Sequence, residues 1–452
     1  MDHMVAHVIG AGYGECIIIE FPDRSVGVID PYSGTGRGVG NNERPEFHSV
    51  IRLLENVIKP PIIRFVMLTH PHADHCMGTA ILLRHFEDSI ERFWIWPCFP
   101  SDGTMKYLLW LKRQNRQEYT EGELGLPSGS ILKELHEVKK WVEEHKDKVA
   151  YFAPGRYDEI LMNNDKGKVC IRFLAPTDRF LSDLFGWLDP IWSQIRFRGN
   201  ECIIPCDQLP SEPNLNHLSA VMVLSWKKAR LLLCGDAETK TWEQIPVTGS
   251  ELDNRNDVVV GWVKISHHGS DNGYNQKFLS SLKVLKPVGV LTPFYRGQEE
   301  KRLPSAKGLS DLHPCFRTIC STCLEKCKHI DGWRNLEIVG TTEMEVLPTS
   351  WVAQITLQPE LLKALASFPE KELQGWNAED FELPTAWFGD ILKNPELVRL
   401  FRPSVRDKVE SAVDVTLKGP EHRFRVSYSF DDNGQPIPIS LKNGAGIYAP
   451  AC

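Results

Sequence analysis

The stretch His70-Pro71-His72-Ala73-Asp74-His75 places three imidazoles and one carboxylate within six residues. It follows directly on residues 63–68, an apolar run typical of a strand buried on both faces of a sheet. Imidazole nitrogen and carboxylate oxygen are the ligands that zinc and related divalent ions prefer. The alternative is a histidine-rich surface loop, but the tight spacing after a buried strand favours a metal site. The stretch therefore predicts a metal centre at the end of a buried strand.

The spacing within this stretch suits two metal ions. In an extended loop, residues two apart point the same way, so His70 and His72 can bind one ion together. Asp74 and His75 can then turn toward a second ion beside the first. One loop cannot complete two coordination spheres, so we expect further ligands at the ends of other strands.

Three later segments offer such ligands next to predicted strands. They are Asp236 after residues 231–234, His267 and His268 after residues 263–265, and His217 before residues 219–226. Taken alone, each has an ordinary reading as a turn or a hydrogen-bonded histidine. Taken together and in this order, they favour a centre that is assembled from several strand ends.

The composition bounds the class of protein. The chain has 452 residues, 42% of them hydrophobic and 25% charged, which is more than one ordinary domain needs. It contains no apolar run long enough for a membrane helix and begins with no signal peptide, so we expect a cytoplasmic protein. Most of the 12 cysteines lie singly in apolar runs, which fits a reducing compartment. A formal charge of −7 argues against a non-specific coat on DNA.

Residues 5–346 form two β-rich halves with helices between them, which predicts two packed sheets covered by helices. Two stretches, residues 101–165 and 189–216, look like insertions. The expected strands are residues 16–21, 25–29, 63–68, 168–174, 219–226, 230–233, 258–265 and 288–291, and the expected helices are residues 49–57 and 131–149.

The character of the chain changes beyond Trp351. We expect residues 351–452 to form a smaller α+β domain, separate from a hydrolase domain at residues 1–346. Its expected elements are short helices at residues 361–367 and 386–393 and a hairpin of residues 422–430 and 437–441. Such a domain could dock a regulatory protein partner.

The order of these motifs resembles that of the metallo-β-lactamase-fold hydrolases. The segments that carry the resemblance are Asp30, the His70–His75 stretch, Gly235-Asp236 and His267-His268-Gly269-Ser270. Within that fold the chain is most similar to the hydrolase domain of bacterial competence (DNA-uptake) proteins, which share a Gly-rich first turn like residues 10–14 and an Asn-x-x-Ser motif like residues 216–219. The resemblance covers residues 5–346 and implies an αββα sandwich, an α/β fold.

The resemblance also implies roles for single residues. His70 and His72 would bind the first metal, Asp74 and His75 the second, and Asp236 would bridge the two. His267 is preferred as the remaining ligand of the second metal, with His268 as its alternative.

Three further roles follow from the same resemblance. His217 is the candidate for the third ligand of the first metal, although the subgroup tends to show Asn there. Asp30 would brace the metal loop without binding metal, and Ser270 would lie just outside the ligands. Arg302-Leu303-Pro304 departs from the His-Pro that commonly follows the last core strand.

Two divalent ions about 3.5–4 Å apart can hold a shared water as hydroxide at neutral pH. Zinc is the expected metal and manganese the alternative, with Asp74, His75 and Asp236 as the catalytic residues. The sequence thus predicts a metal-dependent phosphodiesterase, specifically a nuclease. The alternatives are a small-molecule hydrolase acting on a lactone, thioester or phosphoester, and a partner-binding protein with a vestigial metal site.

Two other clusters have both a functional and an ordinary interpretation. One could hold a structural zinc or could be reduced, buried thiols; its members are Cys315, Cys320, Cys323, Cys327 and His329. The other could contact nucleic acid together with Tyr107 and Trp110 or could be an ordinary amphipathic helix; its members are Lys106, Lys112, Arg113 and Arg116.

Overall fold

The computed structural model describes residues 3–10, 12–33, 48–96, 131–152, 159–177, 179–181, 196–198, 201–203, 215–245, 260–295, 302–327, 329–331, 333–335, 425–430, 435–441 and 446–448. Their helices are α1 (Ser49–Leu53), α2 (Ala73–Cys76), α3 (Thr79–His85), α5 (Ile131–Glu144), α7 (Thr239–Gln244), α9 (Gln276–Leu285) and α10 (Ala306–Leu312). Shorter helical turns are η2 (Leu54–Ile58), η4 (Leu215–Leu218), η5 (Ser266–Gly269), η7 (His313–Cys315) and η8 (Leu324–Cys327).

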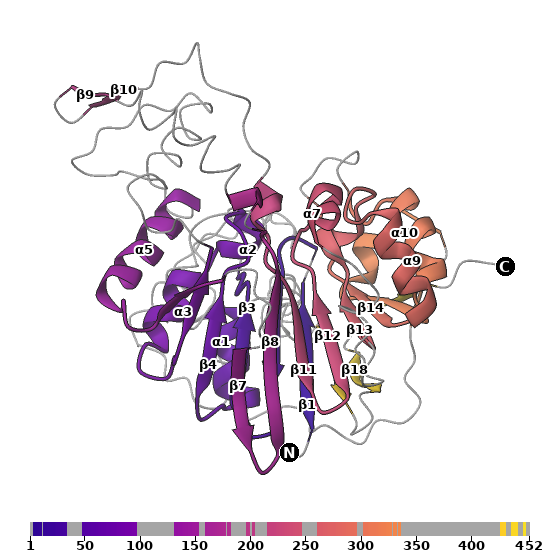
Figure 1. The fold of residues 1–452 in the computed structure, drawn as a ribbon, viewed down its shortest axis with the longest axis horizontal. Coiled ribbons are helices and arrows are strands. Elements are labelled where there is room, and N and C mark those ends of the chain that lie inside the picture. The colour runs from indigo at the N-terminus through magenta and orange to yellow at the C-terminus, as the bar shows by residue number, and fades with distance from the viewer. Residues whose placement is uncertain are drawn as a thin grey trace, which may run out of the picture. The chain divides into compact units, whose positions relative to one another are not determined.

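Within these residues two large sheets form the body of the fold (Figure 1). The first runs in the order β18 (Pro436–Leu441), β17 (Arg425–Phe430), β1 (Met4–Ile9), β2 (Cys16–Glu20), β3 (Val26–Ile29), β4 (Ile63–Met67), β5 (Phe93–Ile95) and β6 (Val149–Tyr151). The second runs in the order β16 (Trp333–Asn335), β19 (Gly446–Tyr448), β15 (Thr318–Ser321), β14 (Val288–Leu291), β13 (Trp262–Lys264), β12 (Ala229–Leu233), β11 (Val221–Trp226), β8 (Gly167–Ala175) and β7 (Glu159–Asn164). β9 (Arg196–Arg198) and β10 (Glu201–Ile203) form a separate two-stranded sheet.

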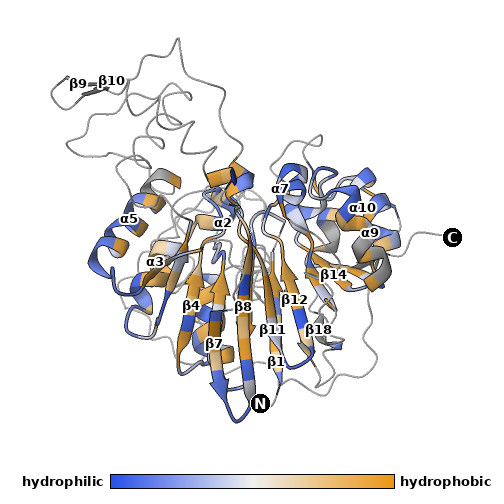
Figure 2. Ribbon diagram, in the orientation of Figure 1, coloured by the Kyte–Doolittle hydropathy of each residue, from blue (hydrophilic) through white to orange (hydrophobic). Residues whose placement is uncertain are grey.

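The side chains of β11 show how the layers pack. Met222 and Leu224 belong to the core that β11 shares with the first sheet, whereas Val221 and Val223 belong to a second core. Successive strand residues point to opposite faces, so β11 is buried on both sides. In Figure 2 the largely hydrophobic strands lie between helices that carry both hydrophilic and hydrophobic residues.

Helices cover the outer faces of both sheets. The first core also contains the apolar residues of α1 and α3, and the second contains those of α7, α9 and α10. The structure is therefore the αββα sandwich that the sequence predicted. No helix among the described residues is long and apolar enough to cross a membrane.

The expected local elements in the first half are confirmed. β2 and β3 pair as an antiparallel hairpin, and α1 continues into η2 before the chain reverses at Lys59, which has a φ of 49°. Proline at positions 60 and 61 follows this end, as expected after a helix.

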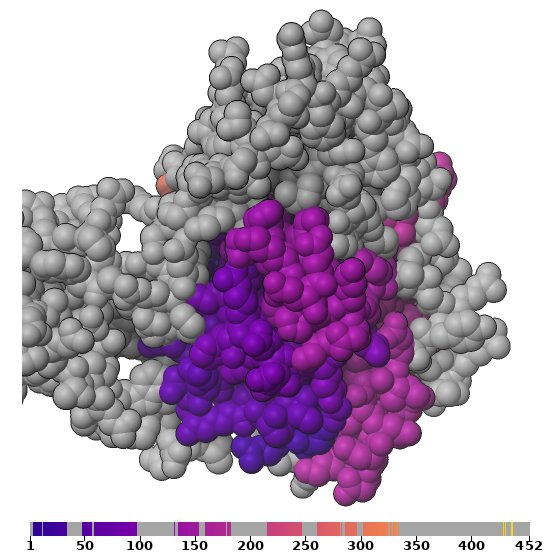
Figure 3. All heavy atoms as spheres, turned by 90° about the vertical axis from the view of Figure 1, so that its left-hand side faces the viewer, coloured from indigo at the N-terminus to yellow at the C-terminus, as the bar shows by residue number. Residues whose placement is uncertain are grey.

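The predicted helix of residues 131–149 forms over residues 131–144 and packs on α3. Glu134 accepts a hydrogen bond from the backbone N–H of Ala80 (2.7 Å), and Glu137 pairs with Arg84. Figure 3 views this face of the molecule. The charged residues predicted to contact nucleic acid, in residues 106–116, lie outside the described residues.

The hairpin near the C-terminus is present, but it does not belong to a separate C-terminal domain. β17 and β18 pair with one another, and β17 also pairs with β1 across its whole length, from Met4↔Phe430 to Ile9↔Arg425. β19 lies between β15 and β16 in the other sheet. β17, β18 and β19 thus complete the sandwich, because β17 extends the first sheet beyond β1 and β19 extends the second beyond β15. The helices expected at residues 361–367 and 386–393 lie outside the described residues.

Candidate metal centre

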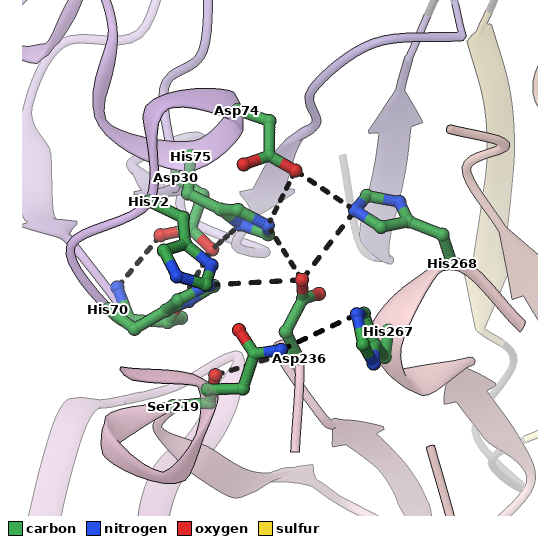
Figure 4. Close-up of polar contacts among 12 residues, drawn as sticks. Asp30, His70, His72, Asp74, His75, Ser219, Asp236, His267 and His268 are labelled. Atoms are coloured by element: carbon green, nitrogen blue, oxygen red, sulfur yellow. Dashed lines mark hydrogen bonds and ion pairs between the residues drawn. The ribbon is translucent and has the colours of Figure 1, made fainter. Parts of the chain in front are cut away.

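Three strand ends bring the candidate ligands together (Figure 4). β4 runs into the His70–His75 stretch, β12 runs into Asp236, and β13 runs into His267 and His268. β12 and β13 are parallel neighbours, so their carboxyl ends meet at one edge of the second sheet. This placement is the one that parallel strands give to ligand sites in α/β folds.

Asp30 holds the chain around the His70–His75 stretch through hydrogen bonds. It accepts hydrogen bonds from the backbone N–H of Thr69 (2.8 Å), the Thr69 hydroxyl (2.7 Å) and Nδ1–H of His75 (2.8 Å). Asp30 and His75 also group with His70 in space, but these hydrogen bonds already use both oxygens of Asp30. The bond to Nδ1 leaves Nε2 of His75 facing the centre.

One group of side chains consists of His70, His72 and Asp236. The two imidazoles approach to 3.1 Å between Nε2 of His70 and Nδ1 of His72. Oδ2 of Asp236 lies 3.8 Å from Nε2 of His70. Their candidate ligand atoms all lie within 4.8 Å of one another, so one ion could contact all three.

A second group consists of Asp74, His75, Asp236 and His268, all of them buried. Nε2 of His268 lies 3.2 Å from Asp74 and 3.7 Å from Asp236, and Nε2 of His75 lies 3.3 Å from Asp236. Asp236 is therefore common to both groups, which is the position of a bridging carboxylate.

The chemistry of these residues fits divalent metal ions. Nε2 of His75 and Oδ1 of Asp236 are buried, and neither has a hydrogen-bond partner within the part of the chain that the structure describes. Burial lowers the pKa of His70 and keeps its imidazole neutral, the form that binds metal. Burial opposes the ionised form of Asp236, but the imidazoles of His75 and His268 outweigh it and hold the pKa of Asp236 well below its ordinary value.

The pKa of His75 reflects the negative charge of the surrounding carboxylates. Burial lowers its pKa, but the carboxylates of Asp236, Asp74 and Asp30 outweigh burial and raise it well above its ordinary value. The centre therefore attracts positive charge, and a divalent ion can satisfy the same carboxylates.

The structure brings His268, and not the preferred His267, into the second group. His267 points toward Asn272, with 3.1 Å between Nδ1 and Oδ1, and toward Glu238 at 3.5 Å. Both histidines have left-handed backbone conformations, with φ of 45° and 53°. Such strain costs about 1–3 kcal/mol per non-glycine residue and is concentrated at functional sites. Adjacent residues on this sharp turn point different ways, which the sequence alone does not reveal.

His217 also lies outside both groups. It packs edge-on against Phe180, with 5.3 Å between ring centroids, whereas its neighbour Asn216 lines the pocket. The one-residue difference arises because both lie in η4, a tight helical turn whose consecutive side chains diverge. Ser270 donates to Asn272 (2.6 Å) and so supports the turn that carries the two histidines.

Two buried charged residues beside the centre were not singled out from the sequence. Glu15 precedes β2, and Lys264 ends β13; their side chains pair at 2.6 Å between Oε2 and Nζ. A lysine inside the apolar residues 262–265 was the signal that could have revealed the pair.

A pocket of about 270 Å³ opens onto the candidate ligands. One wall is apolar and contains Tyr13, Phe294 and Leu303. The rings of Tyr13 and Phe294 lie 5.2 Å apart, and the ring of Phe294 lies 5.2 Å from that of His268. An aromatic wall thus stands directly beside the centre.

The cysteine cluster does not gather as a zinc site. Among the described residues no metal-binding group contains Cys315, Cys320, Cys323, Cys327 or His329. Burial raises the pKa of Cys320 to about 11 and that of Cys327 to about 12, so these thiols stay protonated. The ordinary interpretation, reduced and buried cysteines, fits the structure better because the turns in this segment point the thiols into separate contacts.

Comparisons with known proteins identify the family of the chain. The family model of the metallo-beta-lactamase superfamily matches residues 9–292. Among solved structures, a mutant form of the CmlA beta-hydroxylase is similar, with 13% sequence identity and a TM-score of 0.29. The similarity covers 64% of this chain and 45% of that chain, so this chain spans less than half of its length. No curated protein matches the sequence.

Proposed function

Because the chain belongs to the metallo-beta-lactamase superfamily, whose members are mostly metal-dependent hydrolases, we propose that it is a two-metal phosphodiesterase of the nuclease type. One observation carries the proposal: Asp236 is shared by two separate groups of buried imidazoles and carboxylates. A site for a single ion needs no second group, and a vestigial site has no reason to retain both. His70 and His72 would hold one ion, and Asp74, His75 and His268 the other.

Two such ions would supply an activated water and a positive centre for the charge that develops on the substrate. The residues of the chain supply the geometry. Asp236 would contact both ions, and Asp30 fixes the orientation of His75. Asn216 and His267, which line the pocket without joining either group, can orient substrate oxygens.

The shape of the pocket supports a phosphodiester substrate with a planar group. Stacking of a nucleic-acid base on an aromatic side chain stabilises binding by about 1–3 kcal/mol. Tyr13 and Phe294 offer such a surface beside the centre. The Gly-rich first turn, which contains Tyr13, and the His267–Ser270 motif resemble the competence-protein type of hydrolase and point the same way.

The pocket volume also suits the second candidate, a small-molecule hydrolase. About 270 Å³ is near the lower bound of ordinary ligand pockets and would hold a lactone, a thioester or a single nucleotide. The nature of the scissile bond therefore decides between the two candidates.

The deciding experiment is a substrate panel with the full chain, supplied with zinc or manganese. The panel contains bis(p-nitrophenyl) phosphate, single- and double-stranded DNA, RNA, a lactone and a thioester. We expect turnover of the phosphodiesters by the wild type and none by Asp74→Ala, provided that circular dichroism shows the variant to be folded.

Hydrolysis of only the lactone or thioester would contradict the phosphodiesterase and leave the metal-dependent hydrolase. Equal turnover by Asp74→Ala and the wild type would contradict the role of the second ligand group.

A further inference from the structure

The buried ion pair of Glu15 and Lys264 lies just beneath the second ligand group. Glu15 is 1% exposed and Lys264 is 0% exposed, and the two side chains approach to 2.6 Å. Removing two charges from water is costly, and apolar residues of similar size often serve stability equally well. We therefore expect this ion pair to have a role other than stabilising the fold.

Glu15 is connected to His268 through Thr292. The Thr292 hydroxyl donates a hydrogen bond to Oε2 of Glu15. The same oxygen forms the ion pair with Nζ of Lys264. Nδ1 of His268 lies 2.9 Å from the carbonyl oxygen of Thr292 and 3.1 Å from its hydroxyl oxygen. With its proton on Nδ1, His268 presents the lone pair of Nε2 to the centre.

Glu15 is also connected to Asp74. Its backbone N–H donates to the carbonyl oxygen of Asp74 at 3.0 Å. A single residue thus contacts the loop of one candidate ligand directly and reaches a second through one hydroxyl group. Within the second group, Asp74 and His268 are the farthest apart in the sequence, 194 positions, and they meet at 3.2 Å.

The arrangement parallels that of Asp30. Asp30 accepts a hydrogen bond from the hydroxyl of Thr69 and orients His75 through a direct hydrogen bond. Glu15 accepts a hydrogen bond from the hydroxyl of Thr292, and that hydroxyl in turn contacts Nδ1 of His268. Each sheet therefore supplies one histidine of the second group, and each histidine has a buried carboxylate behind it.

We infer that Glu15, Lys264 and Thr292 form a positioning unit that holds His268 and the Asp74 loop in place for the second metal. Lys264 fixes and neutralises Glu15, Glu15 fixes the Thr292 hydroxyl, and Thr292 fixes the imidazole of His268. The inference rests on the metal centre proposed above, but it needs no particular substrate. Outer partners of metal ligands typically change metal affinity by roughly 10- to 100-fold when they are removed.

The test compares the metal affinities of full-length variants, using Zn²⁺ in competition with a chromophoric chelator. Thr292→Val removes the hydroxyl link and keeps the shape of the side chain, and Thr292→Ser restores the link. Glu15→Gln removes the charge. Glu20→Gln is the matched control, because Glu20 is also buried and pairs with His7 on the same sheet.

We expect Thr292→Val and Glu15→Gln to weaken one of two zinc sites by roughly 10-fold or more and to leave the other unchanged. Thr292→Ser and Glu20→Gln should keep both affinities. With Co²⁺ in place of zinc, the absorption bands of one site should change in Thr292→Val and return in Thr292→Ser.

Two unchanged affinities in Thr292→Val would overturn the inference, whatever the melting temperatures of the variants. So would equal weakening of both sites, or a wild type that binds fewer than two ions. Because no substrate is present, failure of the phosphodiesterase assay alone leaves this result intact. If Glu15→Gln does not fold, the two Thr292 variants still decide.

Discussion

Asp236 is the residue on which both ligand groups depend. It is 2% exposed, its backbone N–H donates to Ser219, and its side chain faces His70, His75 and His268. Removing this carboxylate takes the shared ligand and one negative charge from both groups. At the same scale, the imidazole of His268 lies 3.7 Å from Asp236, whereas His267 contacts Asn272 and Glu238.

Exchanging the two neighbouring histidines for alanine separates their roles. His268→Ala should lose one of two bound ions, because it removes a member of the second group. His267→Ala should keep both ions, since His267 contacts Asn272 and Glu238 instead. Metal analysis by mass spectrometry checks both variants. The opposite pattern would restore His267 as the ligand.

The sequence was informative about residues where chemistry and spacing coincide. The His70–His75 stretch and Asp236 could be identified because several donors follow apolar runs. The orientations of His217 and His268 could not be predicted. Both lie in short helical turns, where neighbouring side chains point in different directions. Glu15 and Lys264 were missed because partners 249 positions apart meet only through the packing of two sheets.

At the scale of elements, α1 is tied to the turn that follows the metal loop. His48 caps α1 by accepting from the backbone N–H of Ile51, and its Nε2–H donates to the carbonyl oxygen of Gly78 (2.9 Å). These roles require neutral imidazole. Burial lowers the pKa of His48 from 6.5 to about 4.

This lowered pKa gives His48 a defined pH dependence. Its contribution to stability is fully present above pH 6.5 and is lost as pH falls toward 4, because the unfolded chain binds the proton first. His48→Asn keeps a capping side chain but removes the titration. The difference in unfolding free energy between wild type and variant should shrink by about 2 kcal/mol between pH 7 and pH 5. Urea denaturation at both pH values measures this change, and a constant difference would contradict the lowered pKa of His48.

At the scale of the whole molecule, the described C-terminal strands complete the sandwich. Phe430 is 0% exposed and lies across from Met4 on β1. The sequence predicted the hairpin but assigned it to a separate domain, because strand patterns show what is half-buried and not which sheet buries it. The two packed sheets, by contrast, followed from two β-rich halves with helices between them, and the family resemblance implied the αββα order of the layers.

Phe430→Ala should therefore destabilise the unit that contains the metal centre. Truncating a buried phenylalanine typically costs about 3–5 kcal/mol. Ile160→Ala is the control: Ile160 is 55% exposed on β7, and surface changes stay within about 0.5 kcal/mol. Denaturation followed by intrinsic tryptophan fluorescence reports the loss. A main transition that Phe430→Ala leaves unchanged would return residues 425–430 to a separate domain.

In the proposed centre, two ions share Asp236 as a ligand. The most direct measurement is the metal-to-protein ratio of the purified full chain and of Asp236→Ala, determined by plasma mass spectrometry after equilibration with zinc and removal of loosely bound ions. We expect two ions per wild-type chain and fewer than one in the variant, with both proteins folded. A wild type that retains one ion or none, or an Asp236→Ala variant that still retains two, would contradict the proposed centre.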